Sequence, residues 1–181
     1  MSAALNVTDP IFLVHGKARL ALHVLREGWG RPLLILHGLG EASPATVPAH
    51  LDIWSGPVYA LDLTGHGQST MPVGGGYTAE ILMADVDAAL ARLGKTTVYG
   101  RGLGAYVALL IGGGRPDLVV GVILDDGPGL VGGGIRPGSP HVPTVDTTDP
   151  GPNVPAESCA LISLTNALKS RYERDCTRSS W

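Results

Sequence analysis

The feature that most constrains the fold is a regular alternation of strand-like and helix-like segments along the first 126 residues. Short apolar runs that stop at Gly or Asp are typical of buried strands, whereas apolar residues spaced by three or four are typical of helices with one buried face. The two kinds of segment alternate from about residue 31. Strands are expected at residues 32–36, 57–61, 96–99 and 119–124, and helices at residues 43–54, 78–93 and 103–111. This alternation favours a parallel sheet with helices on both faces.

A hairpin precedes these units. Residues 11–14 and 19–24 are apolar and rich in β-branched side chains, and His15-Gly16-Lys17 separates them, a pattern typical of two antiparallel strands. With 181 residues the chain has room for one ordinary domain. We therefore predict a single-domain α/β fold, with a mostly parallel, doubly wound sheet of about six strands and an N-terminal antiparallel hairpin.

The last third of the chain has a different character. Residues 127–155 are dense in Gly and Pro and show no apolar period, which favours a linker or surface loop. Residues 156–174 regain a helical apolar stripe, made of Leu161, Leu164, Leu168 and Tyr172. We divide the chain into a core at residues 1–126, the linker or loop at 127–155, and a C-terminal helix with its tail at 156–181.

Composition excludes several classes of partner. A formal net charge of −3 provides no basic face for nucleic acid or for an anionic membrane. Residues 1–10 lack a basic stretch followed by an apolar one, and no apolar run approaches the length of a membrane span. The two cysteines, Cys159 and Cys176, form no CxxC pair, so we expect reduced thiols and no metal site. These features predict a soluble, cytoplasmic protein.

Three short motifs follow predicted strands, where open α/β sheets place their ligand sites. They are His37-Gly38-Leu39-Gly40, the stretch from Asp62 to Ser69 (DLTGHGQS), and the stretch from Gly100 to Tyr106 (GRGLGAY). In this order and on these strand ends they resemble the successive landmarks of the α/β-hydrolase family, over roughly residues 11–126. The resemblance implies a relative of enzymes that hydrolyse esters and other small molecules without a metal or cofactor.

The resemblance also implies roles for individual residues. The backbone N–H groups of Leu39 and Leu103 would form the oxyanion hole. His37, His66 and Ser69 match positions that shape loops in the family. A small-molecule ligand or substrate would then bind in a pocket lined by His37, Gly38, Leu39, Arg101, Gly102 and Leu103.

The family pattern fails at its central position. In the motif G-x-S-x-G the third residue is the nucleophilic serine at the apex of a sharp turn, the nucleophile elbow, and here that residue is Gly102. Gly fits such a turn because it adopts positive φ without strain. The general base is also missing, since His141 lies in the Gly/Pro-rich stretch. Asp126 is a candidate for the acid or for capping the next turn. We therefore expect a catalytically impaired or inactive hydrolase.

A dinucleotide site is the first alternative. Gly100, Gly102 and Ala105 satisfy the G-x-G-x-x-G/A fingerprint, and Asp125 and Asp126 stand at the next strand end, a little over 20 residues on. This alternative implies NAD(P) as cofactor. Against it, the fingerprint normally opens the first strand–helix–strand unit of its domain, and Arg101 would have to lie beside the pyrophosphate.

A non-enzymatic scaffold is the second alternative. The fold would then keep a pocket for a small ligand, or present a surface to a partner. If no further strand follows residue 124, the sixth strand is an edge with unpaired backbone groups. The C-terminal helix could cover that edge, or a second copy of the chain could pair with it as a homodimer.

Overall fold

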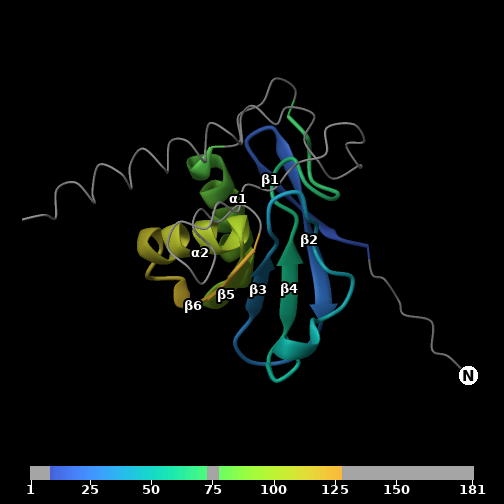
Figure 1. Cartoon of the computed structure of the whole chain (residues 1–181), viewed down its shortest axis with the longest axis vertical. Coiled ribbons are helices and arrows are strands. Elements are labelled where there is room, and N and C mark those ends of the chain that lie inside the picture. The colour runs from blue at the N-terminus through green and yellow to red at the C-terminus, as the bar shows by residue number, and fades with distance from the viewer. Residues whose placement is uncertain (1–8, 73–77, 128–181) are drawn as a thin grey trace, which may run out of the picture.

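The computed structural model describes residues 9–72 and 78–127. In these residues six strands form one sheet in the order β1-β2-β4-β3-β5-β6 (Figure 1). The pairs β4–β3, β3–β5 and β5–β6 are parallel, and the pairs β1–β2 and β2–β4 are antiparallel. The strands are β1 (Ile11–His15), β2 (Ala18–Arg26), β3 (Leu33–Leu36), β4 (Val58–Leu61), β5 (Thr96–Arg101) and β6 (Val119–Asp125). The predicted mostly parallel sheet with its N-terminal hairpin is confirmed.

Strand β3 shows why a short unbroken apolar run forms a central strand. All four of its residues are buried, because successive side chains point to opposite faces and both faces of a parallel sheet are covered. Leu34 and Leu36 join the larger core cluster, and Leu33 and Ile35 join a second cluster on the other face.

Two helices cover the face that carries the larger cluster. Helix α1 (Ala79–Leu93) begins after Thr78, whose hydroxyl accepts a hydrogen bond from the Ile81 N–H, and it ends at Gly94, which has a φ of 75°. Helix α2 (Leu103–Gly114) connects β5 to β6. Figure 1 shows the two helices side by side on one side of the sheet. Both contribute buried side chains to the same core as Leu34 and Leu36.

The predicted helix at residues 43–54 is wrong. The structure has a single 3₁₀ turn there, η1 (Ala49–Leu51), preceded by Pro48. Pro44 is compatible with a first helical turn, but Pro48 lies inside the expected helix. Proline lacks an N–H and disfavours helical backbone in the residue before it, so Pro48 prevents a continuous helix. The Ser43 N–H donates to the Asp62 carboxylate (2.8 Å) instead of starting a helix. The second face of the sheet is consequently covered by loop and η1 alone in the described residues.

The remaining predictions on organisation concern residues 128–181, which lie outside the described residues. They include most of the linker and the whole C-terminal helix. In the part of the chain that the structure describes, no helix combines the length and the apolar character needed to cross a bilayer.

Candidate functional site

The turn at residues 100–104, hereafter the elbow, joins β5 to α2 and has Gly102 at its apex. Gly102 adopts φ 56° and ψ −117°, a left-handed conformation that strains any residue with a Cβ. Its N–H donates to the Asp125 carbonyl (3.1 Å) and its carbonyl accepts from the Tyr106 N–H (3.1 Å). The apex is thus fixed from both sides by backbone hydrogen bonds.

Glycine is required on both sides of the apex because the backbone approaches so closely. A Cβ on Gly100 would lie 2.2 Å from the Gly104 carbonyl oxygen, and a Cβ on Gly104 would lie 2.4 Å from the Leu36 carbonyl oxygen. The Gly104 N–H also donates to the His37 carbonyl (3.0 Å). The start of α2 therefore packs directly against the end of β3 and the loop that follows it.

The loop at residues 37–41 is tied to the elbow by a carboxylate. One oxygen of Glu41 accepts the Gly38 N–H (2.9 Å), and the other pairs with the Arg101 guanidinium. The hydrogen bond from Glu41 raises the pKa of Arg101 above its usual value. Leu39 lies within this loop, and Leu103 is the first residue of α2, where an N–H has no acceptor inside the helix.

His37 and His66 use both of their ring nitrogens to hold these loops. His37 Nδ1 donates to the Gly38 carbonyl (2.8 Å) while its Nε2 accepts the Leu63 N–H (3.1 Å). His66 Nδ1 donates to the Thr64 carbonyl (3.2 Å) while its Nε2 accepts the Gly40 N–H (3.3 Å). Since backbone carbonyls only accept and N–H groups only donate, both rings are held neutral.

Burial also favours the neutral form of the two rings, because it lowers the pKa of each. It lowers the pKa of His37, and burial together with the neighbouring His37 lowers the pKa of His66 to about 4. The ring centroids lie 4.8 Å apart. At neutral pH each ring is a neutral imidazole whose one N–H is bonded to a carbonyl and whose one lone pair accepts a backbone N–H, so neither is free for acid–base chemistry.

Asp62 organises the loop after β4. Its carboxylate accepts hydrogen bonds from His23 Nε2 (2.9 Å) and from the backbone N–H groups of Ser43 and Gln68 (2.8 Å each). Burial alone would raise the pKa of Asp62, but the hydrogen bonds from His23, Gln68 and Ser43 hold it well below its usual range. The Ser69 hydroxyl donates to the Asp62 carbonyl (2.5 Å) and accepts the Ala21 N–H (2.9 Å), so Ser69 binds its own loop and the adjacent strand.

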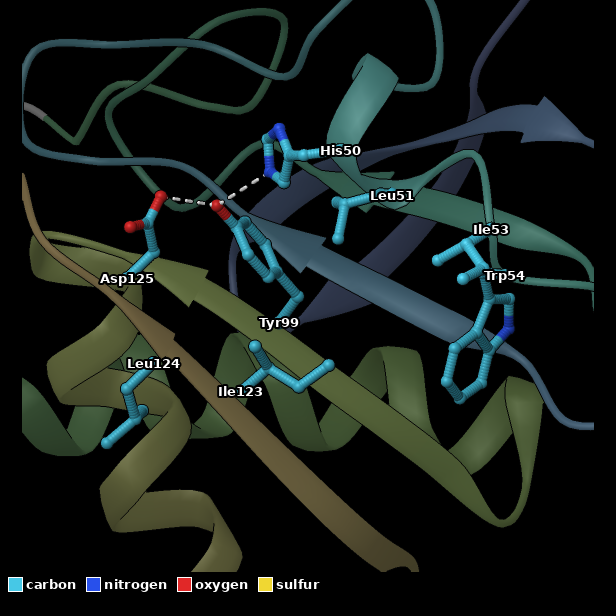
Figure 2. A pocket seen from close by; sticks show the side chains of 8 residues that line it. All are labelled: His50, Leu51, Ile53, Trp54, Tyr99, Ile123, Leu124 and Asp125. Atoms are coloured by element: carbon cyan, nitrogen blue, oxygen red, sulfur yellow. Dashed lines mark hydrogen bonds between the residues drawn. The ribbon is translucent and has the colours of Figure 1, made fainter.

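A hollow of about 490 Å³ lies on the sheet face opposite α1 and α2, where the sequence analysis expected no site. A hydrogen-bond chain lies at its polar end (Figure 2). The Tyr99 hydroxyl donates to the Asp125 carboxylate (2.6 Å), and His50 Nε2 lies 3.2 Å from the same hydroxyl. Burial and the hydrogen bond to Asp125 raise the pKa of Tyr99. The lining residues are His50, Leu51, Ile53, Trp54, Tyr99, Ile123, Leu124 and Asp125.

None of the residues expected to line a ligand pocket lines this hollow. His37, Gly38 and Leu39 lie in the loop beside the elbow, and Arg101, Gly102 and Leu103 form the elbow itself. The hollow was missed because its polar groups come from three distant segments. The one available sequence signal was the alternation along β5, which places Tyr99 on the face opposite Val98 and α2.

The acidic candidates have local partners. Asp125, at the end of β6, accepts the Tyr99 hydroxyl, and Asp126 is exposed and accepts the Gly127 N–H (2.8 Å). Ala105 of the dinucleotide fingerprint is buried in α2, and His141 lies outside the described residues. Within residues 9–72 and 78–127, no group of three His, Cys, Asp or Glu side chains is placed to hold a metal ion.

The sheet order, the elbow and the loop beside it define an α/β protein with a sharp turn between a central strand and a helix. Comparison with known families identifies the family. The chain belongs to the alpha/beta hydrolase family, whose sequence model matches residues 11–176.

Individual relatives are named as hydrolases or as a thioesterase. The chain is 32% identical over 105 residues to (E)-2-((N-methylformamido)methylene)succinate hydrolase of Acinetobacter baylyi. The aligned residues make up 54% of this chain and 38% of the relative. The structure resembles E-2-(acetamidomethylene)succinate hydrolase (27% identity, TM-score 0.55, 62% of this chain and 42% of that one). It also resembles the thioesterase domain from the curacin biosynthetic pathway (26% identity, TM-score 0.59, 66% and 46%). The chain thus spans less than half the length of these relatives.

Proposed function

We propose that this chain is an alpha/beta hydrolase whose elbow has lost its nucleophile, so that the chain binds a small acyl compound but hydrolyses it poorly or not at all. The observation that carries the proposal is Gly102 at the apex, with φ 56° and ψ −117°. The backbone has the shape that projects a reactive side chain in this family, and no side chain is present to project.

The missing nucleophile accounts for a large loss of rate. Removal of the nucleophile from a Ser-His-Asp triad costs roughly 10⁶ in turnover, and a rate of only about 10³ to 10⁴ over water remains from the oxyanion hole and substrate binding. The backbone N–H groups of Leu39 and Leu103 are the proposed oxyanion donors. Support for this role comes from Gly104 and Glu41, which hold the loop at residues 37–41 against the elbow.

The histidines near the elbow do not provide a general base. Both nitrogens of His37 and of His66 are engaged by backbone groups, and a general base needs a free lone pair within hydrogen-bond reach of the proton it removes. Replacing Gly102 by serine should therefore not be sufficient to create an efficient enzyme.

The proposed ligand class follows from the relatives. Two of them are named as hydrolases of acylated aminomethylene succinates, compounds that combine an amide with carboxylates. In this chain a carbonyl bound at the elbow would lie beside Arg101, whose guanidinium is paired with Glu41.

The proposal is tested by assaying the full chain and two variants, Gly102→Ser and the matched Gly102→Ala. The substrates are p-nitrophenyl acetate and (E)-2-(acetamidomethylene)succinate. We expect all three proteins to stay close to the buffer blank. Turnover by the wild-type chain that persists after purification from host esterases would contradict the proposed loss of activity. A large gain in Gly102→Ser, absent from Gly102→Ala and blocked by a fluorophosphonate, would show that a base is in place.

A further inference from the structure

A single carboxylate occupies two hydrogen-bond donors beside the elbow. The Glu41 side chain accepts the Gly38 N–H (2.9 Å) through one oxygen and pairs with the Arg101 guanidinium through the other. A backbone N–H next to a guanidinium suits a carboxylate, because both donors form charge-assisted hydrogen bonds with it. Gly38 and Arg101 therefore form a carboxylate-binding pair, hereafter the carboxylate site, which the chain fills with its own Glu41.

The carboxylate site adjoins the proposed oxyanion donors. Gly38 directly precedes Leu39, and Gly102 alone separates Arg101 from Leu103. Successive Cα atoms are about 3.8 Å apart, so a carbonyl bound by the N–H groups of Leu39 and Leu103 would lie within a few bond lengths of the carboxylate site. One small compound can thus place its carbonyl on the oxyanion donors and a carboxylate on the carboxylate site.

Glu41 can leave the carboxylate site at little cost. The side chains of Arg101 and Glu41 are 40% and 35% exposed, and ion pairs that solvent reaches contribute little to stability. The loop at residues 37–41 is not held by Glu41 alone, because the Gly104 N–H donates to the His37 carbonyl (3.0 Å). A ligand carboxylate in place of Glu41 would restore both hydrogen bonds that Glu41 gives up.

Asp125, the other carboxylate beside Arg101, already has partners of its own. One of its oxygens accepts the Tyr99 hydroxyl (2.6 Å), and the other accepts the Asp126 N–H (2.9 Å). Within residues 9–72 and 78–127, the ion pair of Arg101 is with Glu41. A ligand carboxylate would therefore compete with Glu41 for the guanidinium.

We propose that the ligand of this chain is an acyl compound with a carboxylate a few bonds from its carbonyl, and that this carboxylate displaces Glu41 from Gly38 and Arg101. Glu41 is then an internal competitor for the carboxylate site. A neutral ester gains nothing from Arg101 and leaves Glu41 in place, so Arg101 selects acids over neutral compounds. This inference rests on the proposed function, because it assumes a carbonyl bound at the elbow, and it adds the residues that select the ligand.

The chain offers a matched control for this ion pair. Arg115, directly after α2, pairs with Asp87, and the two side chains are 35% and 42% exposed. Arg101 lies before the first residue of the same helix, so the two ion pairs are at its opposite ends. An effect on binding that comes from net charge alone should appear equally at both pairs.

Calorimetric titration of the full chain with (E)-2-(acetamidomethylene)succinate and with its dimethyl ester tests the inference. Glu41→Gln keeps an acceptor for the Gly38 N–H but cannot neutralise Arg101, so the acid should bind about tenfold more tightly. Arg101→Gln should weaken binding of the acid about tenfold, and the double variant should bind as weakly as Arg101→Gln. Asp87→Asn and Arg115→Gln should bind like the wild type. The ester should respond to none of these substitutions.

The outcomes separate this inference from the proposed function. Unchanged binding of the acid in Glu41→Gln or in Arg101→Gln would overturn the inference while the proposed function stands, because the compound still binds. An equal gain in Asp87→Asn would overturn it in the same way. Binding of neither compound to any of the proteins would overturn the proposed function and the inference with it.

A second measurement needs no substitution and so does not depend on the folding of a variant. In ¹⁵N-labelled wild-type chain, titration with the acid should shift the Gly38 amide and Arg101 Nε–H resonances, whereas the Arg115 Nε–H resonance should stay in place. The ester should leave all three unchanged. Binding of the acid without a shift at Gly38 and Arg101 would overturn the inference.

Discussion

The loop after β4 and the turn after β5 stand at the same edge of the sheet, yet they are stabilised in opposite ways. The loop after β4 depends on polar side chains, with the Asp62 carboxylate and the rings of His23 and His66 each bonded to a neighbouring group. The elbow depends on the absence of side chains at Gly100 and Gly104, and on the positive φ of Gly102. The stability of the loop after β4 should therefore depend on pH and on substitutions that change charge. The stability of the elbow should depend on substitutions that add side-chain volume or restrict the backbone.

This difference explains how the elbow keeps its shape with a glycine at its apex. The elbow is held by backbone hydrogen bonds from Gly102 to Asp125 and from Gly104 to His37, and none of them involves a side chain at residue 102. The geometry of the turn is therefore independent of any side chain at residue 102. In the loop after β4 the loss of a side chain would remove the bonds that define the loop.

The largest expected effect is on the elbow. Gly104→Val should destabilise the protein by about 4 kcal/mol, because a Cβ at this position would lie 2.4 Å from a backbone oxygen of Leu36 that cannot move aside. Urea unfolding measures the change. Gly113→Ala is the control, since a Cβ there meets nothing within 4 Å. Equal midpoints for the two variants would contradict the close packing of α2 on β3.

Acidification should weaken the loop after β4. His66 has a pKa of about 4 in the folded chain and 6.5 as its usual value, so the unfolded chain binds its proton more readily. This contribution to stability is complete above pH 6.5 and declines by about 3 kcal/mol as the pH falls to 4. The lowered pKa of His37 acts in the same direction, and the raised pKa of buried Asp85 opposes both.

Comparison with His66→Gln isolates the histidine. Unfolding free energies from urea titrations at pH 7, 5.5 and 4 should fall more steeply for the wild type than for His66→Gln, since Asp85 and His37 are common to both. Parallel pH profiles would show that His66 is not held neutral by the fold.

Asp62→Asn should cost about 2 kcal/mol, because the amide cannot accept as strongly from His23 and from the N–H groups of Ser43 and Gln68. Asp52→Asn removes an acidic partner of Arg26 at a site that is 74% exposed and should change stability by less than about 0.5 kcal/mol. Thermal unfolding at pH 7 compares the two. A loss for Asp62→Asn no larger than that for Asp52→Asn would refute the central position of Asp62.

The smallest effect is expected at the apex. Gly102→Ala should cost about 1 kcal/mol, the strain of a Cβ at positive φ. Gly16→Ala has nearly the same φ, 58°, and nothing within 4 Å of its Cβ, so it should cost a similar amount. A much larger loss for Gly102→Ala in the same unfolding assay would mean that the apex lacks room for a side chain.

The sequence predicted the sheet well because apolar runs such as residues 32–36 and 57–61 leave little choice of structure. It also located the elbow and the two loops beside it, since Gly and His at strand ends are local signals. The helix expected at residues 43–54 failed because Ser43 and Pro44 were interpreted as its cap and first turn, whereas Pro48 interrupts the segment and the Ser43 N–H binds Asp62. The hydrogen-bond chain of His50, Tyr99 and Asp125 could not be predicted, because the pairing of β3, β5 and β6 is what brings a loop and two strands together.

Incubation of the wild-type chain with a fluorophosphonate, followed by intact-mass measurement, tests the absence of a nucleophile most directly. The reagent phosphonylates an activated serine in a working hydrolase site and labels unactivated hydroxyls slowly. We predict a mass unchanged from that of the untreated protein. A rapid adduct of one equivalent, mapped to any residue of the folded chain, would contradict the account by revealing a nucleophile that the glycine apex does not supply.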